Sequence, residues 1–271
     1  MNRSQPHRRW TSLTRLGALI ASASLVLVPT LRAAGPPAAP AAAGTTGSIK
    51  GRLIYAAGPI PSPKIAVKAG DPKVKDDVCK TKDITDKDLV VDEATKGVAN
   101  GIAYLVKPSG NFAATEAALL EKTPAVVIDQ VGCEFLPFAT VVHKDQKLTF
   151  KSSDPVGHNI RFSSFANGSI NQMLPPNGKT AFAIKKEERR PTPLFCDIHP
   201  WMKGYFFIVD HPFAVVTEPD GSFEIKDVPA GPQQLVVWQT RGYINEGGNK
   251  GMKVEVRAGE ATDVGDVKII K

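Results

Sequence analysis

Short stretches in which apolar and polar residues alternate recur along the chain from residue 47 onwards. Residues 48–55, Ser-Ile-Lys-Gly-Arg-Leu-Ile-Tyr, place apolar side chains at every second position, which is the period of a β-strand with one buried face. Turns rich in Gly, Pro and Asp separate such stretches, as in residues 58–61 and 219–221. The same criteria predict strands at residues 65–67, 89–91, 101–106, 125–128, 139–142, 147–151, 159–162, 180–184, 194–196, 205–209, 214–217, 223–225 and 235–238. The pattern therefore predicts an all-β chain.

Several other stretches and residues depart from this alternation. Residues 113–122 are rich in Ala and Leu, which favour helix, and predict a short surface helix. Residues 71–97 are densely charged and predict a loop-rich region with one short strand. The run Lys-Lys-Glu-Glu-Arg-Arg at residues 185–190 is balanced in sign and predicts an exposed hairpin. His143 and His211 stand next to charged residues or Pro, so we expect both to be solvated.

The composition favours β architecture, and the charge distribution excludes one class of partner. The chain has 271 residues, of which 42% are hydrophobic and 7% aromatic, with 23 Gly and 22 Pro. The formal net charge of +7 is concentrated at the N-terminus, because residues 1–33 contain five Arg and no acidic residue. The rest of the chain has 29 basic and 27 acidic residues and is nearly neutral. This balance gives no support to nucleic-acid binding.

The first 33 residues have the pattern of a secretory signal peptide. Four Arg precede an apolar run at residues 16–31, and small residues follow at Ala33 and Ala34. The run is short and rich in small residues for a membrane span, so we expect cleavage, with an uncleaved membrane anchor as the alternative. Residues 34–47 are rich in Ala, Pro and Gly and predict a flexible linker. The mature protein is then expected in the periplasm or outside the cell.

The candidate chemistry is concentrated in residues 196–202, Cys-Asp-Ile-His-Pro-Trp-Met. Cys196, His199 and Met202 recur at every third position, so one tight loop is able to turn all three side chains toward a single ion. His158 would join them from a different strand. A thiolate, two imidazoles and a thioether form the ligand set of a blue-copper electron-transfer site, whereas zinc would require a fourth strong donor in place of the thioether. The alternative is that a buried Cys, a surface His and a core Met coincide here by chance.

Residues 133–208 resemble the cupredoxin family, and the loop at residues 196–202 resembles those of amicyanin, pseudoazurin and plastocyanin. The likeness extends to Phe-Leu-Pro at residues 135–137, Ser-Asp-Pro-Val-Gly-His-Asn at residues 153–159 and Met-Lys-Gly-Tyr at residues 202–205. It implies that Asn159 lies beside the copper ligands and hydrogen-bonds around the sulfur of the Cys ligand. The chain departs from the family at Asp145, where a Gly is usual in the turn, and this leaves the turn type open.

The resemblance implies a Greek-key cupredoxin sandwich that binds one copper ion and carries single electrons as the ion alternates between Cu(I) and Cu(II). Such a carrier implies a redox protein as partner, such as a c-type cytochrome, and no enzymatic activity. Pro200 and Trp201 would form part of an apolar docking patch at the edge of His199, or Trp201 would pack over the ligand loop. We expect a monomer that binds no nucleic acid and that contacts a membrane only through an uncleaved signal segment.

Two cysteines, Cys79 and Cys133, remain once Cys196 is assigned to the metal. In an oxidising compartment these two residues are expected to form a disulfide. On the chain-entropy model, closing this loop would stabilise the fold by roughly 4 kcal/mol. Two unpaired thiols are the alternative.

The last sixty residues carry a second resemblance. Its motifs are Ala-Val-Val-Thr at residues 214–217, Pro-Asp-Gly at 219–221, Phe-Glu-Ile at 223–225, Val-Pro-Ala-Gly at 228–231 and Leu-Val-Val-Trp at 235–238. They resemble the transthyretin-like module of carboxypeptidase regulatory domains, and they imply a second, smaller transthyretin-like β-sandwich. Such a module typically begins with a strand like residues 47–53, so both chain ends would build one sandwich with the copper domain inserted. Two sandwiches in series are the alternative.

These observations divide the chain into five parts. They are the signal peptide (1–33), the linker (34–47), an N-terminal β region that pairs with the C-terminal module in the inserted arrangement (48–124), the cupredoxin domain (125–209) and the transthyretin-like module (210–271).

Two other classes of function remain open from the sequence. The first is a cell-surface binding or structural β-sandwich protein that contacts carbohydrate or protein and either stores copper or has no metal role. The second is an enzyme, which would need an open metal site or a nucleophile with its base, and the sequence shows neither pattern. The presence of all four candidate ligands favours the electron carrier.

Overall fold

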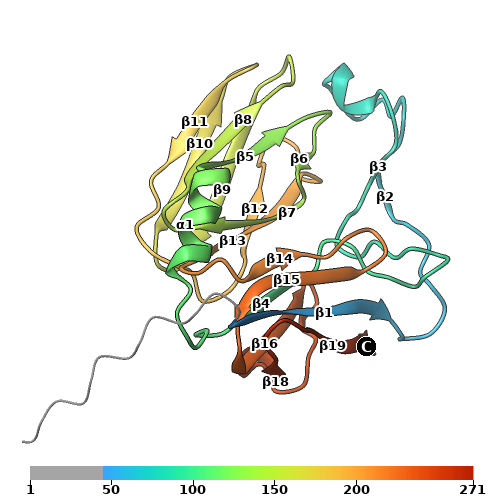
Figure 1. Ribbon diagram of the computed structural model, residues 1–271. Coiled ribbons are helices and arrows are strands. Elements are labelled where there is room, and N and C mark those ends of the chain that lie inside the picture. Colours follow the sequence, from blue (N-terminus) through green and yellow to red (C-terminus); the bar gives the residue numbers. More distant parts are fainter. Residues whose placement is uncertain (1–44, 271) are drawn as a thin grey trace, which may run out of the picture. The chain divides into compact units, whose positions relative to one another are not determined.

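The computed structural model describes residues 45–270, and its regular structure is almost entirely β-strand (Figure 1). One α-helix, α1 (Ala113–Lys122), and two short 3-10 helices, η1 (Asp77–Lys80) and η2 (Gly248–Lys250), are the helical elements of this range. The predicted all-β class is confirmed, and the helix at residues 113–122 has the predicted bounds. The predicted signal peptide and all but the end of the predicted linker lie outside the described residues. Strand β1 begins at Thr46, inside the range predicted as linker.

Within residues 45–270, no helix is long and apolar enough to cross a membrane.

Two sheets contain all the strands between residues 125 and 209. A five-stranded sheet has the order β10-β9-β12-β13-β7, and a four-stranded sheet has the order β11-β8-β5-β6. Their strands are β5 (Ala125–Gln130), β6 (Phe135–Leu136), β7 (Ala139–His143), β8 (Lys147–Ser152), β9 (His158–Ser164), β10 (Gly168–Leu174), β11 (Lys179–Phe182), β12 (Thr192–Phe195) and β13 (Lys203–Val209). One apolar cluster joins the two sheets: the ring of Phe206 lies 6.0 Å from that of Phe150 and 4.9 Å from that of Phe162, centroid to centroid.

Two further sheets combine strands from both ends of the described chain. A three-stranded sheet has the order β15-β1-β19, and a second sheet has the order β14-β4-β16-β17 with β18 paired to β16. Their strands are β1 (Thr46–Tyr55), β4 (Ile102–Leu105), β14 (Ala214–Val216), β15 (Ser222–Pro229), β16 (Gly231–Gln239), β17 (Gly242–Tyr243), β18 (Met252–Val256) and β19 (Ala261–Ile269). Strand β1 runs antiparallel to β15 and parallel to β19, and β4 runs antiparallel to β16. Residues 125–209 therefore lie, in sequence, between strands that share the same sheets.

A separate two-stranded hairpin, β2 (Ile65–Val67) and β3 (Ile84–Thr85), carries the segment that contains η1. Cys79 of η1 forms a disulfide with Cys133, as the sequence predicts. The disulfide connects the hairpin to the turn that precedes β6.

The prediction of a strand at residues 89–91 is wrong, because only Val91 pairs, in an isolated bridge.

Two histidines that were expected to be solvated are buried. His143 is 1% exposed and its Nε2 lies 2.9 Å from a carboxylate oxygen of Glu116 on α1. His211 is 5% exposed, accepts the N–H of Phe213 at Nδ1 and stacks on that ring. The expectation was wrong because it considered only the adjacent residues, whereas Glu116 reaches His143 from 27 positions away.

The charged run at residues 185–190 was expected to be an exposed hairpin, but it contains no strand and one of its residues, Glu188, is buried. Glu188 is 5% exposed and accepts hydrogen bonds from the turn between β9 and β10. Its donors are the hydroxyl of Ser164, the N–H groups of Phe165 and Ala166 and the side-chain amide of Asn167. Strand β11 ends at Phe182, and the N–H groups of Lys185 and Lys186 then donate to the side-chain oxygen of Asn167 in this turn.

The burial of His211 makes the stability of the fold pH-dependent. Burial lowers the pKa of His211 from its ordinary value of 6.5, so the unfolded chain binds more protons there than the folded one as the pH falls below that value. The contribution of neutral His211 is present above the ordinary pKa and is lost as the pH falls toward the folded pKa. We expect the free energy of unfolding, measured by urea denaturation from about pH 7.5 to about pH 5.5, to fall less steeply in His211→Gln than in the wild type. Equal slopes would contradict the assignment.

Candidate metal centre

The loop at residues 196–202, here called the ligand loop, joins two neighbouring antiparallel strands. Strand β12 ends at Phe195 and β13 begins at Lys203. The Met202 N–H donates to the carbonyl of His199 at 2.8 Å, and the Cys196 N–H donates to the carbonyl of Met202 at 3.2 Å. These two bonds close the loop tightly. Cys196, His199 and Met202 are each exposed by 2% or less.

The remaining candidate donor, His158, reaches the ligand loop from β9 and meets His199 there. His158 begins β9, is fully buried, and its Nδ1 lies 2.9 Å from Nδ1 of His199. Sγ of Cys196 lies 3.8 Å from the same His199 nitrogen, and one ligand atom from each of the three residues lies within 4.8 Å of the others. A thiol and two imidazole nitrogens therefore converge in a buried site, with Met202 in the same apolar cluster.

The tautomers of these two histidines make the convergence chemically informative. His158 Nε2 lies 2.8 Å from a carboxylate oxygen of Asp154, and His199 Nε2 lies 2.9 Å from one of Asp76. A carboxylate accepts, so each Nε2 carries a proton, and the lone pair of a ring in its neutral form then lies at Nδ1. Two lone pairs facing each other at 2.9 Å repel unless a cation or a proton lies between them. The donor set thus fits a soft metal ion held by one thiolate and two imidazoles.

The surroundings of Cys196 favour its thiolate. Burial opposes ionisation, but the neighbouring side chains of His158 and His199 and the backbone N–H of Asn159 together lower the pKa of Cys196 to about 6. Burial also opposes protonation of His199, but its bonds to Cys196 and Asp76 raise the pKa of this imidazole. The thiolate is the form that binds metal, and it is available near neutral pH.

Asn159 fixes the ligand loop against β9. Its N–H points at Sγ of Cys196 at 3.4 Å, and its side-chain oxygen accepts the N–H of Asp197 at 2.5 Å. Its side-chain nitrogen donates to Asn171 on β10 at 2.7 Å. The structure therefore places Asn159 beside the sulfur, where the sequence resemblance puts it.

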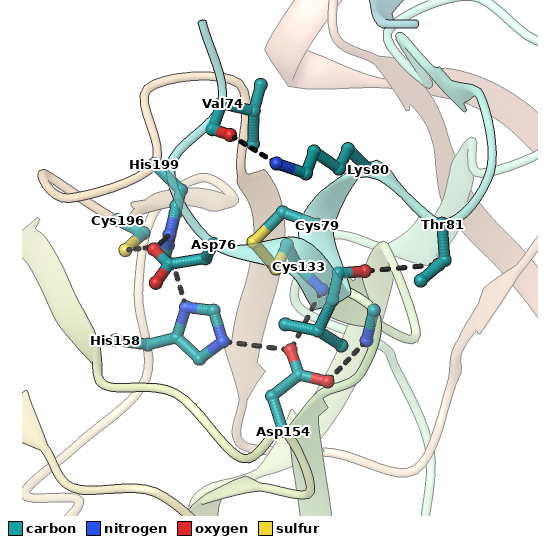
Figure 2. The surroundings of a disulfide bond; sticks show 12 residues. Val74, Asp76, Cys79, Lys80, Thr81, Cys133, Asp154, His158, Cys196 and His199 are labelled. Atoms are coloured by element: carbon teal, nitrogen blue, oxygen red, sulfur yellow. Dashed lines mark hydrogen bonds and ion pairs between the residues drawn. A yellow bond between two sulfur atoms is a disulfide. The ribbon is translucent and has the colours of Figure 1, made fainter. Parts of the chain in front are cut away.

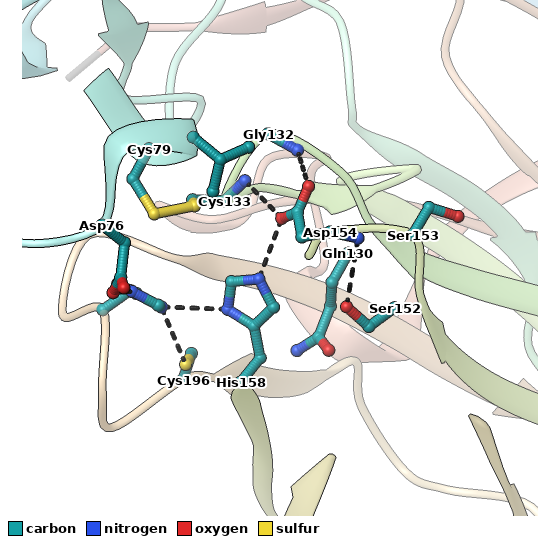
Figure 3. Close-up of polar contacts among 12 residues, drawn as sticks. Asp76, Cys79, Gln130, Gly132, Cys133, Ser152, Ser153, Asp154, His158 and Cys196 are labelled. Atoms are coloured by element: carbon teal, nitrogen blue, oxygen red, sulfur yellow. Dashed lines mark hydrogen bonds and ion pairs between the residues drawn. A yellow bond between two sulfur atoms is a disulfide. The ribbon is translucent and has the colours of Figure 1, made fainter. Parts of the chain in front are cut away.

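Asp154 is a site residue that the sequence analysis missed. It is 3% exposed, and besides His158 it accepts the N–H groups of Gly132 at 2.6 Å and Cys133 at 2.8 Å (Figure 3). These bonds hold its carboxylate against Nε2 of His158. The sequence did contain a signal for this residue, because Asp154 stands four positions before His158 in the motif at residues 153–159.

Asp76 is the second missed residue, and no local signal points to it. It belongs to the charged segment between β2 and β3 and lies 123 positions from its partner His199 (Figure 2). Only the folded chain brings the two together.

The two predicted docking residues lie at the outer side of the ligand loop. Trp201 is half-buried, its ring centroid lies 5.2 Å from that of His199, and its indole N–H donates to the carbonyl of Cys133 at 3.2 Å. Pro200 is exposed. Trp201 therefore packs over the ligand loop, and its role in docking stays a prediction.

Comparisons with known proteins leave the family open. No family model matches the chain, and no curated protein matches it. A reduced Cu(I) form of an amicyanin variant at pH 4 is 22% identical over 40% of this chain and 98% of that chain, with a TM-score of 0.29. Amicyanin from Paracoccus versutus is 18% identical over 31% of this chain and 81% of that chain, with a TM-score of 0.27. A copper-containing nitrite reductase from Thermus scotoductus SA-01 is 18% identical over 31% of this chain and 22% of that chain, with a TM-score of 0.29. Likeness at such TM-scores assigns no function, which has to come from the site itself.

The bond from His158 to Asp154 gives the first test of the site. In Asp154→Asn one oxygen becomes an NH2 donor that faces either the N–H of Gly132 or the N–H groups of Cys133 and His158. The side chain is then unable to accept all three bonds, so His158 is held less firmly. We expect the affinity for Cu(II), measured by competition with a chelator, to fall about 10–100-fold. Asp129→Asn is the matched control, because Asp129 makes exposed bonds to Lys151 and Ser153 instead. Unchanged affinity in a folded Asp154→Asn protein would refute the role.

Proposed function

We propose that this protein is an exported electron carrier that holds one copper ion at His158, Cys196, His199 and Met202. The observation that carries the proposal is the convergence of Sγ of Cys196 with the Nδ1 atoms of both histidines in a site whose four candidate ligands are each exposed by 2% or less. A bound copper ion would supply one-electron redox chemistry in this set of donors.

The burial of the site favours electron transfer over catalysis at the metal. A catalytic metal keeps an open position that a substrate is able to reach. Here Nε2 of His158 is bonded to Asp154 and Nε2 of His199 to Asp76, and the sulfur is covered by Asn159. An electron crosses such a barrier without contact between partner and metal, whereas a substrate does not. We therefore propose a carrier and not an enzyme.

The protein's contribution is to keep the ligands where they are. The hydrogen bonds that close the ligand loop, and those of Asn159 and Asp154, resist movement of the ligands when the charge of the metal changes. A site that rearranges little lets an electron move with a small reorganisation cost. The N–H of Asn159 withdraws charge from the sulfur, which is one of the contacts that tune the potential of such a site.

The proposed context is the periplasm or the cell surface, with a redox protein such as a c-type cytochrome as partner. The exposed Pro200 and the half-buried Trp201, next to His199, support a small apolar contact surface there. The N-terminal sequence pattern supports export.

The test of the proposal is the visible spectrum of the protein after one equivalent of Cu(II). We expect an intense blue band that bleaches with ascorbate and returns in air, because thiolate-bound Cu(II) has such a band and the site is redox-active. Cys196→Ser is expected to lose the band. Met202→Leu is expected to keep it while the reduction potential rises, because loss of a weak thioether donor would destabilise Cu(II) more than Cu(I). A colourless wild-type protein, or a Cys196→Ser protein of the same colour, would refute the carrier and favour the structural or copper-storing alternative.

A further inference from the structure

The imidazole of His199 is covered by a segment from outside residues 125–209. Residues 68–88, here called the cover, run from the end of β2 through η1 and β3. Asp76 of the cover contacts Nε2 of His199 at 2.9 Å, and the side chain of His199 is only 3% exposed while that of Asp76 is 37% exposed. The carboxylate thus caps the outer nitrogen of the imidazole, and Figure 2 shows the two side chains next to each other.

Apolar packing and the disulfide hold the cover in place. Val74, Cys79 and Ile84 are 7%, 1% and 3% exposed and belong to the same apolar cluster as Cys196 and Met202. The disulfide to Cys133 adds a covalent link between the cover and the sheets that carry the ligands. The N–H of Cys79 donates to the carbonyl of Asp76 at 3.0 Å, which ties the position of Asp76 to that of the disulfide.

Ion pairs hold the far end of the cover. Lys82 and Lys87 lie 3.1 and 2.6 Å from the two carboxylate oxygens of Glu134, the residue after Cys133. Lys203, the residue after Met202, lies 3.0 Å from Asp86 and also pairs with Asp88. All four ion pairs join the cover to positions directly beside a disulfide cysteine or a candidate ligand.

The disulfide also connects the two carboxylates that bond the histidines. On one side, Asp154 bonds His158 and accepts the N–H of Cys133. On the other side, Asp76 bonds His199 and accepts the N–H of Cys79 through its carbonyl. Both disulfide sulfurs and a ring nitrogen of His199 lie within 4.8 Å of one another. The bridge therefore fixes both carboxylate–imidazole pairs relative to each other.

We propose that Asp76 is a positioning residue for His199 and that the disulfide-anchored cover delivers it. The bond to Nε2 keeps the proton on that nitrogen and aims the Nδ1 lone pair at the metal position. The cover also keeps water and small reagents from the outer edge of the imidazole. The inference rests on the proposed copper site for its purpose, but the shielding of His199 is a property of the metal-free protein and is testable without copper.

The first experiment uses the metal-free full chain and the imidazole reagent diethyl pyrocarbonate. Modification of His199 is followed over time by peptide mass spectrometry in the wild type, Asp76→Ala and Asp77→Ala. Asp77 is the matched control, because its side chain is 93% exposed and pairs only with Lys80 among the contacts described. We expect Asp76→Ala to modify at least about tenfold faster at His199, the size expected for loss of a hydrogen bond to a charged group, and Asp77→Ala to behave as the wild type.

A second arm separates Asp76 from the cover that carries it. Treatment of the wild type with a dithiol, or the double replacement of Cys79 and Cys133 by Ser, removes the covalent anchor and leaves Asp76 in the chain. We expect His199 to become reactive in both cases, while His143, bonded to Glu116 in a different part of the fold, keeps its protection. Protection of His143 also shows that the protein remains folded.

The outcomes distinguish this inference from the proposed function. Equal reactivity of His199 in the wild type and Asp76→Ala would overturn the positioning role, whatever the protein does with copper. If the wild type binds copper, we also expect a chelator to extract Cu(I) faster from Asp76→Ala than from Asp77→Ala, and equal rates would overturn the role. A wild type that never turns blue would refute the copper carrier and leave the protection of His199 to be judged by the reagent alone.

Discussion

The proposed copper site depends on one constraint: two imidazoles have to present unprotonated Nδ1 atoms to the same point. A neutral imidazole carries its proton on one nitrogen, and a hydrogen-bond acceptor at Nε2 decides which. Asp154 and Asp76 supply the acceptors for His158 and His199. Without them either ring is free to place its proton at Nδ1, where a metal ligand needs a lone pair. The two carboxylates therefore matter to the chemistry as much as the donors they orient.

The sheet order explains how residues 38 positions apart in sequence become neighbours. Strand β12 lies between β9 and β13, so the start of β9 and the loop from β12 to β13 belong to adjacent strands of one sheet. Phe195 pairs with Arg161, which sets the register of β12 against β9. Asn159 then bridges from β9 to the ligand loop by its side chain. The backbone ladder sets the approach of the ligands, and a single amide locks it.

The sequence was sufficient wherever a local rule decides the outcome. Alternation predicted most strands, and helix propensity predicted α1 with its bounds. The choice of candidate ligands by their chemistry grouped His158 with the ligand loop, and the structure brings them together. The sequence was insufficient where a distant partner buries a polar residue, as for His143 and Glu188, or where the fold brings a polar residue to a distant partner, as for Asp76. Strand β10 escaped detection for a related reason: six of its seven residues are not buried, so it lacks an apolar face. Burial of a polar group is decided by hydrogen bonds that form only after the chain has folded.

Strand β13 links the site to the rest of the protein, because both of its faces are buried. Phe206 and Ile208 enter the cluster between the two sheets of residues 125–209. On the opposite face, the ring of Phe207 lies 4.7 Å from that of Tyr104, and the ring of Tyr205 lies 5.2 Å from that of Trp238. This second face would expose aromatic surface if residues 125–209 stood alone, at a cost of about 25 cal/mol for each Å² of apolar area returned to water.

The sheet that contains β4 and β16 buries this second face of β13. The cover over His199, residues 68–88, belongs to the same N-terminal half of the chain as β4. The segments outside residues 125–209 thus support the proposed copper site from two sides, by burying the outer face of β13 and by supplying the carboxylate that contacts His199.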